Sequence, residues 1–106
     1  MKKDKHVTKV IFRNLKGQII ALFPEEPGDN SPYTCSSYMH VGQHGAASVS
    51  LSTIARLATP QEYKPLAKEL EELGYRLQII KRIPQGAWLK RWNQLNPQTR
   101  SKNNVN

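Results

Sequence analysis

Hydrophobic and polar positions change their spacing several times along the chain, and each change marks an expected element. Apolar and β-branched residues gather in 7–14 and again in 18–23, separated by a short stretch that contains Gly17. Two such runs joined by a three-residue loop, with the glycine in the left-handed conformation, are typical of a β-hairpin. The second run is apolar on both sides, which predicts a strand in the interior of the sheet.

A third and a fourth strand are expected in the middle of the chain. Residues 24–32 hold three prolines, which is typical of an irregular surface loop, and residues 35–41 then alternate as in a strand. One side of this strand carries Cys35, Ser37, Met39 and Val41, and the other carries Ser36, Tyr38 and His40. A turn is expected at 42–46, followed by a short strand over 47–52 with serines on one face.

The clearest local signal is Thr59-Pro60-Gln61-Glu62. Threonine is a good helix cap, proline is favoured at the first helical position, and a glutamate three residues after the cap can accept from the cap N–H. A helix is therefore expected over 60–73, where Gly74 ends it. Alternation in 75–80 predicts a fifth strand.

These elements give the order ββββαβ and predict an α+β fold. We expect a mostly antiparallel sheet of four or five strands with one helix packed on a face. A C-terminal amphipathic helix follows the sheet. The expected organisation is a disordered basic N-terminus at 1–6, a single domain at 7–83, the amphipathic helix at 84–96 and a disordered polar tail at 97–106.

The net charge of +8 lies at the two ends of the chain. Residues 7–80 contain seven lysines and arginines against seven acids, so the expected domain is balanced. Attraction to a polyanion must then come from the ends, which suggests nucleic acid or a nucleic-acid-handling protein as the partner. The candidate contacts are Arg82, Trp88, Lys90, Arg91 and Trp92. Alternatively, both tryptophans dock on the sheet and the charges face solvent, and this is the stronger expectation.

Candidate binding residues also gather around the expected turn. Flanking glycines would let the turn amides approach a phosphate or carboxylate, with polar side chains at the tip. The residues in question are Tyr38, His40, Gln43 and His44. The alternatives are a plain hairpin tip and, for Tyr38 and His40, the solvated outer face of a sheet.

A different class of function would use Cys35, His40 and His44. Their spacing suits three zinc ligands or a cysteine–histidine dyad. Strand parity argues against both, because it places Cys35 and His40 on opposite faces. No metal and no cofactor are expected, and an enzyme is the less favoured reading.

The single cysteine agrees with a reducing, cytoplasmic location, and no membrane association is expected. The longest apolar run, Ile19 to Phe23, is too short to span a bilayer, and no signal peptide is evident.

Four sequence blocks carry a resemblance to other proteins. They are Ala21-Leu22-Phe23-Pro24-Glu25, Met39-His40-Val41-Gly42-Gln43-His44, Ala58-Thr59-Pro60-Gln61-Glu62-Tyr63 and Leu73-Gly74-Tyr75. In this order they resemble a group of short uncharacterised bacterial, plasmid and phage proteins. The resemblance covers about 10–82, implies a compact unit ending near Arg82, and carries no known activity. It suggests an accessory or inhibitor role of mobile-element origin for a small non-enzymatic binding protein.

Overall fold

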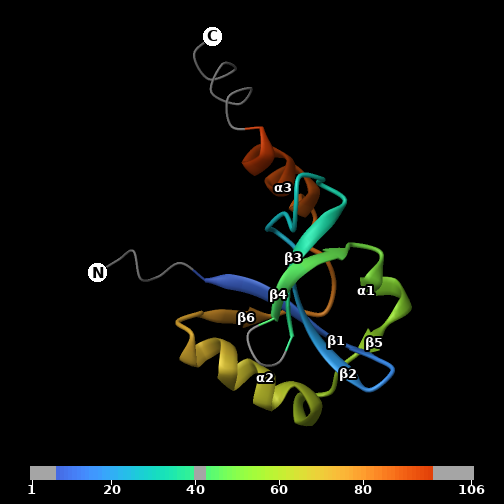
Figure 1. The fold of residues 1–106 in the computed structure, drawn as a ribbon, viewed down its shortest axis with the longest axis vertical. Helices are drawn as coiled ribbons and strands as arrows, with labels where there is room; N and C mark the ends of the chain where they lie inside the picture. Colours follow the sequence, from blue (N-terminus) through green and yellow to red (C-terminus); the bar gives the residue numbers. More distant parts are fainter. Residues whose placement is uncertain (1–6, 40–42, 97–106) are drawn as a thin grey trace.

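A computed structural model describes residues 7–39 and 43–96 and has an α+β fold (Figure 1). The strands are β1 (Thr8–Leu15), β2 (Gln18–Phe23), β3 (Thr34–Met39), β4 (Gln43–Ser48), β5 (Arg56–Leu57) and β6 (Leu77–Ile79). The helices are α1 (Leu51–Ile54), α2 (Pro60–Glu72) and α3 (Ala87–Leu95). The predicted fold class is confirmed, since the sheet is mostly antiparallel and a helix covers one face.

The first strand of the chain, β1, lies inside the sheet between β2 and the two short strands β5 and β6. The strand order is β4-β3-β2-β1-β5, and β6 also pairs with β1. β5 pairs antiparallel with residues 13–14 of β1, whereas β6 pairs in parallel with residues 8–10. β5 and β6 thus pair with different parts of the same edge of β1, the edge that faces away from β2.

The turn between β1 and β2 is tighter than the sequence suggested. Leu15 pairs directly with Gln18, so only two residues connect the strands and the expected three-residue loop is wrong. Lys16 and Gly17 have φ angles of 51° and 93°. Positive φ at both central residues is the geometry of a tight hairpin turn whose twist matches the strands. The Asn14 side-chain oxygen accepts from the Gly17 N–H at 2.7 Å and supports this turn.

The β3–β4 hairpin corrects a second expectation. β4 begins at Gln43, which pairs with Met39, so Gly45 and Ala46 belong to the strand and not to a turn. The expected strand over 47–52 is also wrong, because α1 begins at Leu51. Glycine, alanine and serine have little local preference for a strand or a turn at these positions. The register of the hairpin follows instead from apolar residues such as Cys35 and Ala47, which pair with each other. Residues 40–42 lie outside the described residues.

The start of α2 is the one predicted in detail. Thr59 Oγ1 accepts from the Glu62 N–H, and the Glu62 carboxylate accepts from the Thr59 N–H at 2.9 Å. The same carboxylate accepts from Arg56 and from Asn14. Hydrogen bonds from Arg56 and the Thr59 backbone lower the pKa of Glu62 to about 2. The cap therefore also ties the helix to β5 and β1.

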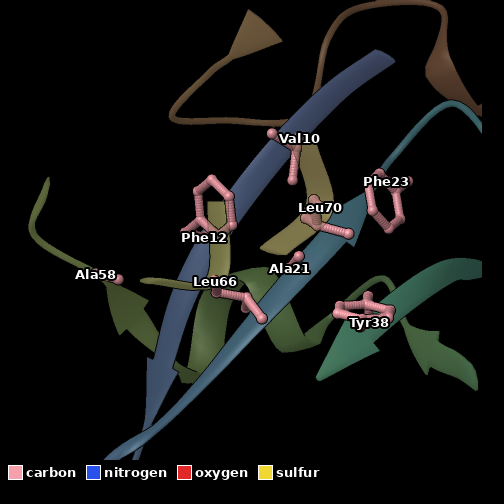
Figure 2. Close-up of a cluster of buried hydrophobic side chains, with 8 residues drawn as sticks. All are labelled: Val10, Phe12, Ala21, Phe23, Tyr38, Ala58, Leu66 and Leu70. Atoms are coloured by element: carbon pink, nitrogen blue, oxygen red, sulfur yellow. The ribbon is translucent and has the colours of Figure 1, made fainter. Parts of the chain in front are cut away.

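Both faces of the sheet are covered. Figure 2 shows the cluster under α2, which consists of Val10, Phe12, Ala21, Phe23, Tyr38, Ala58, Leu66 and Leu70. On the other face Ile11, Ile20, Leu22 and Cys35 are packed by side chains that include Val49, Leu51, Ile80 and Ile83. Tyr38, expected on a polar groove or solvated face, is only 1% exposed because α2 crosses above it.

The C-terminal helix lies apart from the sheet, beside the loop at 24–33 (Figure 1). Trp88 is 41% exposed and Trp92 is half-buried, and neither belongs to a core cluster. Arg91, expected to face solvent, is 3% exposed. The expectation that both tryptophans dock on the sheet is wrong. Within the described residues no helix is long and apolar enough to cross a membrane.

Candidate functional site

Helix α3 is fastened to the loop at 24–33 by side chains that donate to main-chain carbonyls. Arg91 Nε donates to the Pro32 oxygen at 2.7 Å, and Arg91 Nη1 donates to the Pro24 oxygen at 2.5 Å. Gln94 Nε2 donates to the Glu25 oxygen at 2.8 Å. Burial lowers the pKa of the Arg91 guanidinium. The two ends of the loop are therefore held by one side chain, and Arg91 cannot reach a phosphate without leaving this position.

Two lysines share one carboxylate beside this junction. Glu25 Oε2 lies 3.1 Å from Lys9 Nζ and 3.2 Å from Lys90 Nζ, and both lysines are partly exposed. Partial burial opposes ionisation of Glu25, but hydrogen bonds from Lys9 and Lys90 outweigh it and lower its pKa. These three residues line an open cleft of about 490 Å³ between β1, the loop and α3. Glu26 lines the same cleft, so two lysines and two carboxylates lie together there.

On another side of α3 three aromatic rings follow one another across the surface. Tyr33 lies 6.5 Å from Trp88, and Trp88 lies 6.4 Å from Trp92, measured between ring centroids. Tyr33 is 69% exposed and Trp88 41% exposed. The helical spacing of four residues places the two indoles on one face, and the loop brings the phenol to them. We call Tyr33, Trp88 and Trp92 the aromatic row.

The candidate residues of the β3–β4 hairpin are only partly brought together. The Tyr38 hydroxyl donates to the Glu69 carboxylate of α2, and His44 meets the Tyr38 ring edge-on at 4.6 Å between centroids. His44 is exposed, Gln43 is the first residue of β4, and His40 lies outside the described residues. The contacts tie the hairpin to α2. They do not build the exposed turn that was expected to bind an anion.

Cys35 lies on the sheet face opposite His44. Cys35 packs in the second core cluster, whereas His44 contacts Tyr38, which lies under α2. Burial raises the pKa of the Cys35 thiol to about 11, although Arg91 and a backbone hydrogen bond from Phe23 act in the other direction. A thiol of this kind is neutral near pH 7 and a poor nucleophile or metal ligand. Among the described residues, no group of three or more His, Cys, Asp or Glu side chains is placed to hold a metal ion.

The burial of Cys35 predicts an inert thiol. In native protein at pH 8, we expect an aromatic disulfide reagent to modify Cys35 at least about a hundred times more slowly than it modifies the unfolded chain, because the residue is 2% exposed and its pKa is raised to about 11. The measurement is the absorbance of the released thiolate with and without denaturant. Rapid modification of the native protein would show that Cys35 is reachable and would reopen a role in chemistry.

Several residues of this region were not found from the sequence. Glu25 lies in the loop predicted at 24–32, Tyr33 directly follows that loop, and neither they nor Glu69 was a candidate site residue. The proline-rich composition of 24–32 predicted a loop but not its partner, since α3 follows about sixty residues later. One feature of the sequence could have indicated that Arg91 is buried. Arg91 lies four residues after Ala87, on the same face of the helix, and both are buried. Arg82, the remaining candidate contact, is exposed.

The chain was compared with family models, with curated proteins and with solved structures. No family model, curated protein or solved structure matches it.

Proposed function

We propose that the protein is a non-enzymatic binding module that holds single-stranded nucleic acid on the aromatic row of Tyr33, Trp88 and Trp92. Proteins that bind single strands without reading sequence combine aromatic platforms for the bases with positive charge for the backbone. Both components are available in this chain. The proposal rests above all on the exposed position of the aromatic row.

The rigidity of the platform supports this reading. Trp88 and Trp92 stand on a helix that Arg91 fastens to the loop carrying Tyr33, with two short hydrogen bonds. A base that stacks on these rings meets side chains already held in place, so less conformational entropy is lost on binding. Large aromatic side chains at a water-exposed surface are also a common mark of a binding site.

Charge supports the same class of ligand. The chain carries a net charge of +8, and Lys90 is exposed on α3 although it also pairs with Glu25. Arg82 is exposed in the segment that leads to the helix. Cationic side chains of this kind attract a phosphate backbone without selecting its sequence. The proposal therefore includes affinity that falls as salt is added.

A Trp88→Ala variant tests the proposal. Wild-type protein is expected to bind a labelled oligothymidylate of about 16 nucleotides in low salt, and Trp88→Ala is expected to weaken this binding between about fivefold and a hundredfold, because one stacking platform is lost. Fluorescence anisotropy of the labelled strand gives both affinities. Circular dichroism checks that each variant is folded.

Leu89→Ala is the matched control. Leu89 is 54% exposed on the same helix, next to Trp88, and offers no ring for stacking. Its replacement is expected to change the affinity less than about twofold, within the range usual for a surface residue away from the contact. The proposal is wrong if wild-type protein does not bind the strand in low salt. It is also wrong if Leu89→Ala weakens binding as much as Trp88→Ala.

A further inference from the structure

Strand β4 is the last strand at one side of the sheet, and no described strand continues the sheet beyond it (Figure 1). Its six residues, Gln43-His44-Gly45-Ala46-Ala47-Ser48, pair with β3 in one unbroken register. Proteins usually protect such an edge with a lysine, a proline, a bulge or a covering segment. β4 contains no lysine, arginine, aspartate, glutamate or proline, and its register has no bulge.

The hydrogen bonds around β3 show which main-chain groups of β4 point outward. The Val49 N–H donates to the Tyr33 oxygen at 3.0 Å, so this opposed pair is hydrogen-bonded. Hydrogen-bonded and non-hydrogen-bonded pairs alternate in an antiparallel ladder. Tyr38 with His44, Ser36 with Ala46 and Thr34 with Ser48 are therefore the non-hydrogen-bonded pairs. The outward bond from the Ser36 N–H to the Glu26 oxygen at 2.9 Å agrees with this assignment.

Three residues of β4 thus present both main-chain groups at the open edge. They are His44, Ala46 and Ser48, and all three are exposed. Because they lie two residues apart with Ala46 in the centre, the edge is complementary to itself. When a second copy runs antiparallel with Ala46 opposite its own equivalent, His44 of each copy faces Ser48 of the other. All three N–H groups and all three carbonyls of each strand then find a partner.

We propose that the protein forms a symmetric dimer in which β4 pairs with β4 of a second copy, with the two-fold axis at Ala46. Opposed side chains of an antiparallel pair point to the same face, so the two sheets join and both copies of α2 lie on one face of the joined sheet. The dimer is a property separate from nucleic-acid binding, because it uses neither the aromatic row nor the lysine cluster.

A second copy suits this edge better than an unrelated peptide. Strand addition of a foreign segment gains its specificity from pockets for alternate side chains. Gly45, Ala46 and Ala47 are too small to form such pockets, and the backbone of Gly28 packs against the face of Ala46, so the edge of β4 offers main-chain groups more than side-chain pockets. The strand also contains no lysine, arginine, aspartate or glutamate, so two copies place no such charges against each other at the edge.

Long-range repulsion between two copies that each carry a net charge of +8 acts against the dimer. This repulsion is screened by salt, and the Debye length falls from about 8 Å in physiological salt to about 3 Å at 1 M. Dimerisation is therefore expected to strengthen as salt is added. Nucleic-acid binding has the opposite expected dependence, which separates the two properties in experiment.

The first test uses proline at the centre of the edge. Ala46→Pro removes an N–H that points away from β3, so the β3–β4 ladder keeps its hydrogen bonds while the proposed interface loses two. Sedimentation equilibrium up to millimolar protein in high salt is expected to show a wild-type dimer that Ala46→Pro weakens at least about tenfold. Ala46→Ser, which keeps the N–H, is expected to dimerise like the wild type. A wild-type protein that stays monomeric, or a folded Ala46→Pro that dimerises equally well, overturns the proposal.

A second test does not depend on the folding of the proline variant. Opposed residues in an antiparallel pair lie at a Cα separation that a disulfide can span, so oxidised Ala46→Cys is expected to run as a covalent dimer. Ser48→Cys is the matched control, because it lies on the same edge but too far from its own equivalent across the axis. The native Cys35 is buried and stays reduced in both variants. Equal cross-linking of Ser48→Cys, or none of Ala46→Cys, rules out the proposed register.

Discussion

Replacing Leu70 with alanine is expected to lower the free energy of unfolding by about 3 kcal/mol. Leu70 is fully buried where α2 meets the sheet, in the cluster with Phe12, Phe23 and Tyr38 (Figure 2). Shortening the side chain loses apolar burial and leaves a cavity that the opposing strands cannot close. Small domains have total stabilities of about 5–15 kcal/mol, so this one change removes a large share. Urea denaturation followed by circular dichroism gives the loss directly.

Leu73→Ala is the control for this prediction. Leu73 directly follows α2 but is 56% exposed, so its replacement is expected to cost less than about 0.5 kcal/mol. Two leucines three residues apart thus differ sixfold or more in expected cost because only one faces the sheet. If both variants lose the same stability, α2 does not pack on the sheet as described.

The second large effect is expected from Arg91→Leu. The change removes two charged hydrogen bonds and leaves the carbonyls of Pro24 and Pro32 without their donors, at a cost of about 3 kcal/mol. The helix is then expected to leave the loop. The only two tryptophans of the chain lie on α3, and because Trp92 is half-buried, its share of the emission is expected to shift toward longer wavelength as it enters water. Fluorescence and urea denaturation measure the two consequences separately.

Two further variants show whether charge or hydrogen-bond geometry matters. Arg91→Lys keeps the charge but cannot donate to two carbonyls in the planar arrangement of a guanidinium, so it is expected to rescue little. Lys90→Ala breaks an exposed ion pair with Glu25 and is expected to cost less than about 1 kcal/mol. A full rescue by lysine, or an unchanged emission spectrum in Arg91→Leu, would contradict the fastening role of Arg91.

Local chemistry accounts for the parts of the fold that were predictable. The cap at Thr59 and Glu62, the hairpin around Gly17 and the alternation of β3 each depend on residues close in sequence, and each was found, with boundaries shifted by a few residues. The parity of β3 also correctly separated Cys35 from the face of Tyr38. The same parity argued against a zinc site and against a cysteine–histidine dyad at Cys35.

The errors come from contacts between distant segments. An amphipathic pattern was taken to place the tryptophans inward and Arg91 outward, but the helix meets a loop rich in carbonyls and not the sheet. A guanidinium satisfies such a surface better than an indole can. Tyr38 was likewise judged from its own strand, although α2 decides its burial and supplies Glu69. Periodicity shows which residues share a face, but not what that face meets.

The fastening of the loop by Arg91 also sets an order on assembly during translation. Pro24 and Pro32 leave the ribosome long before Arg91, since 67 and 59 residues separate them from it. Until α3 has been synthesised, the two carbonyls have only water as a donor, while the β1–β2 hairpin can already close by local contacts. The loop of the nascent chain therefore lacks these two hydrogen bonds until α3 has emerged.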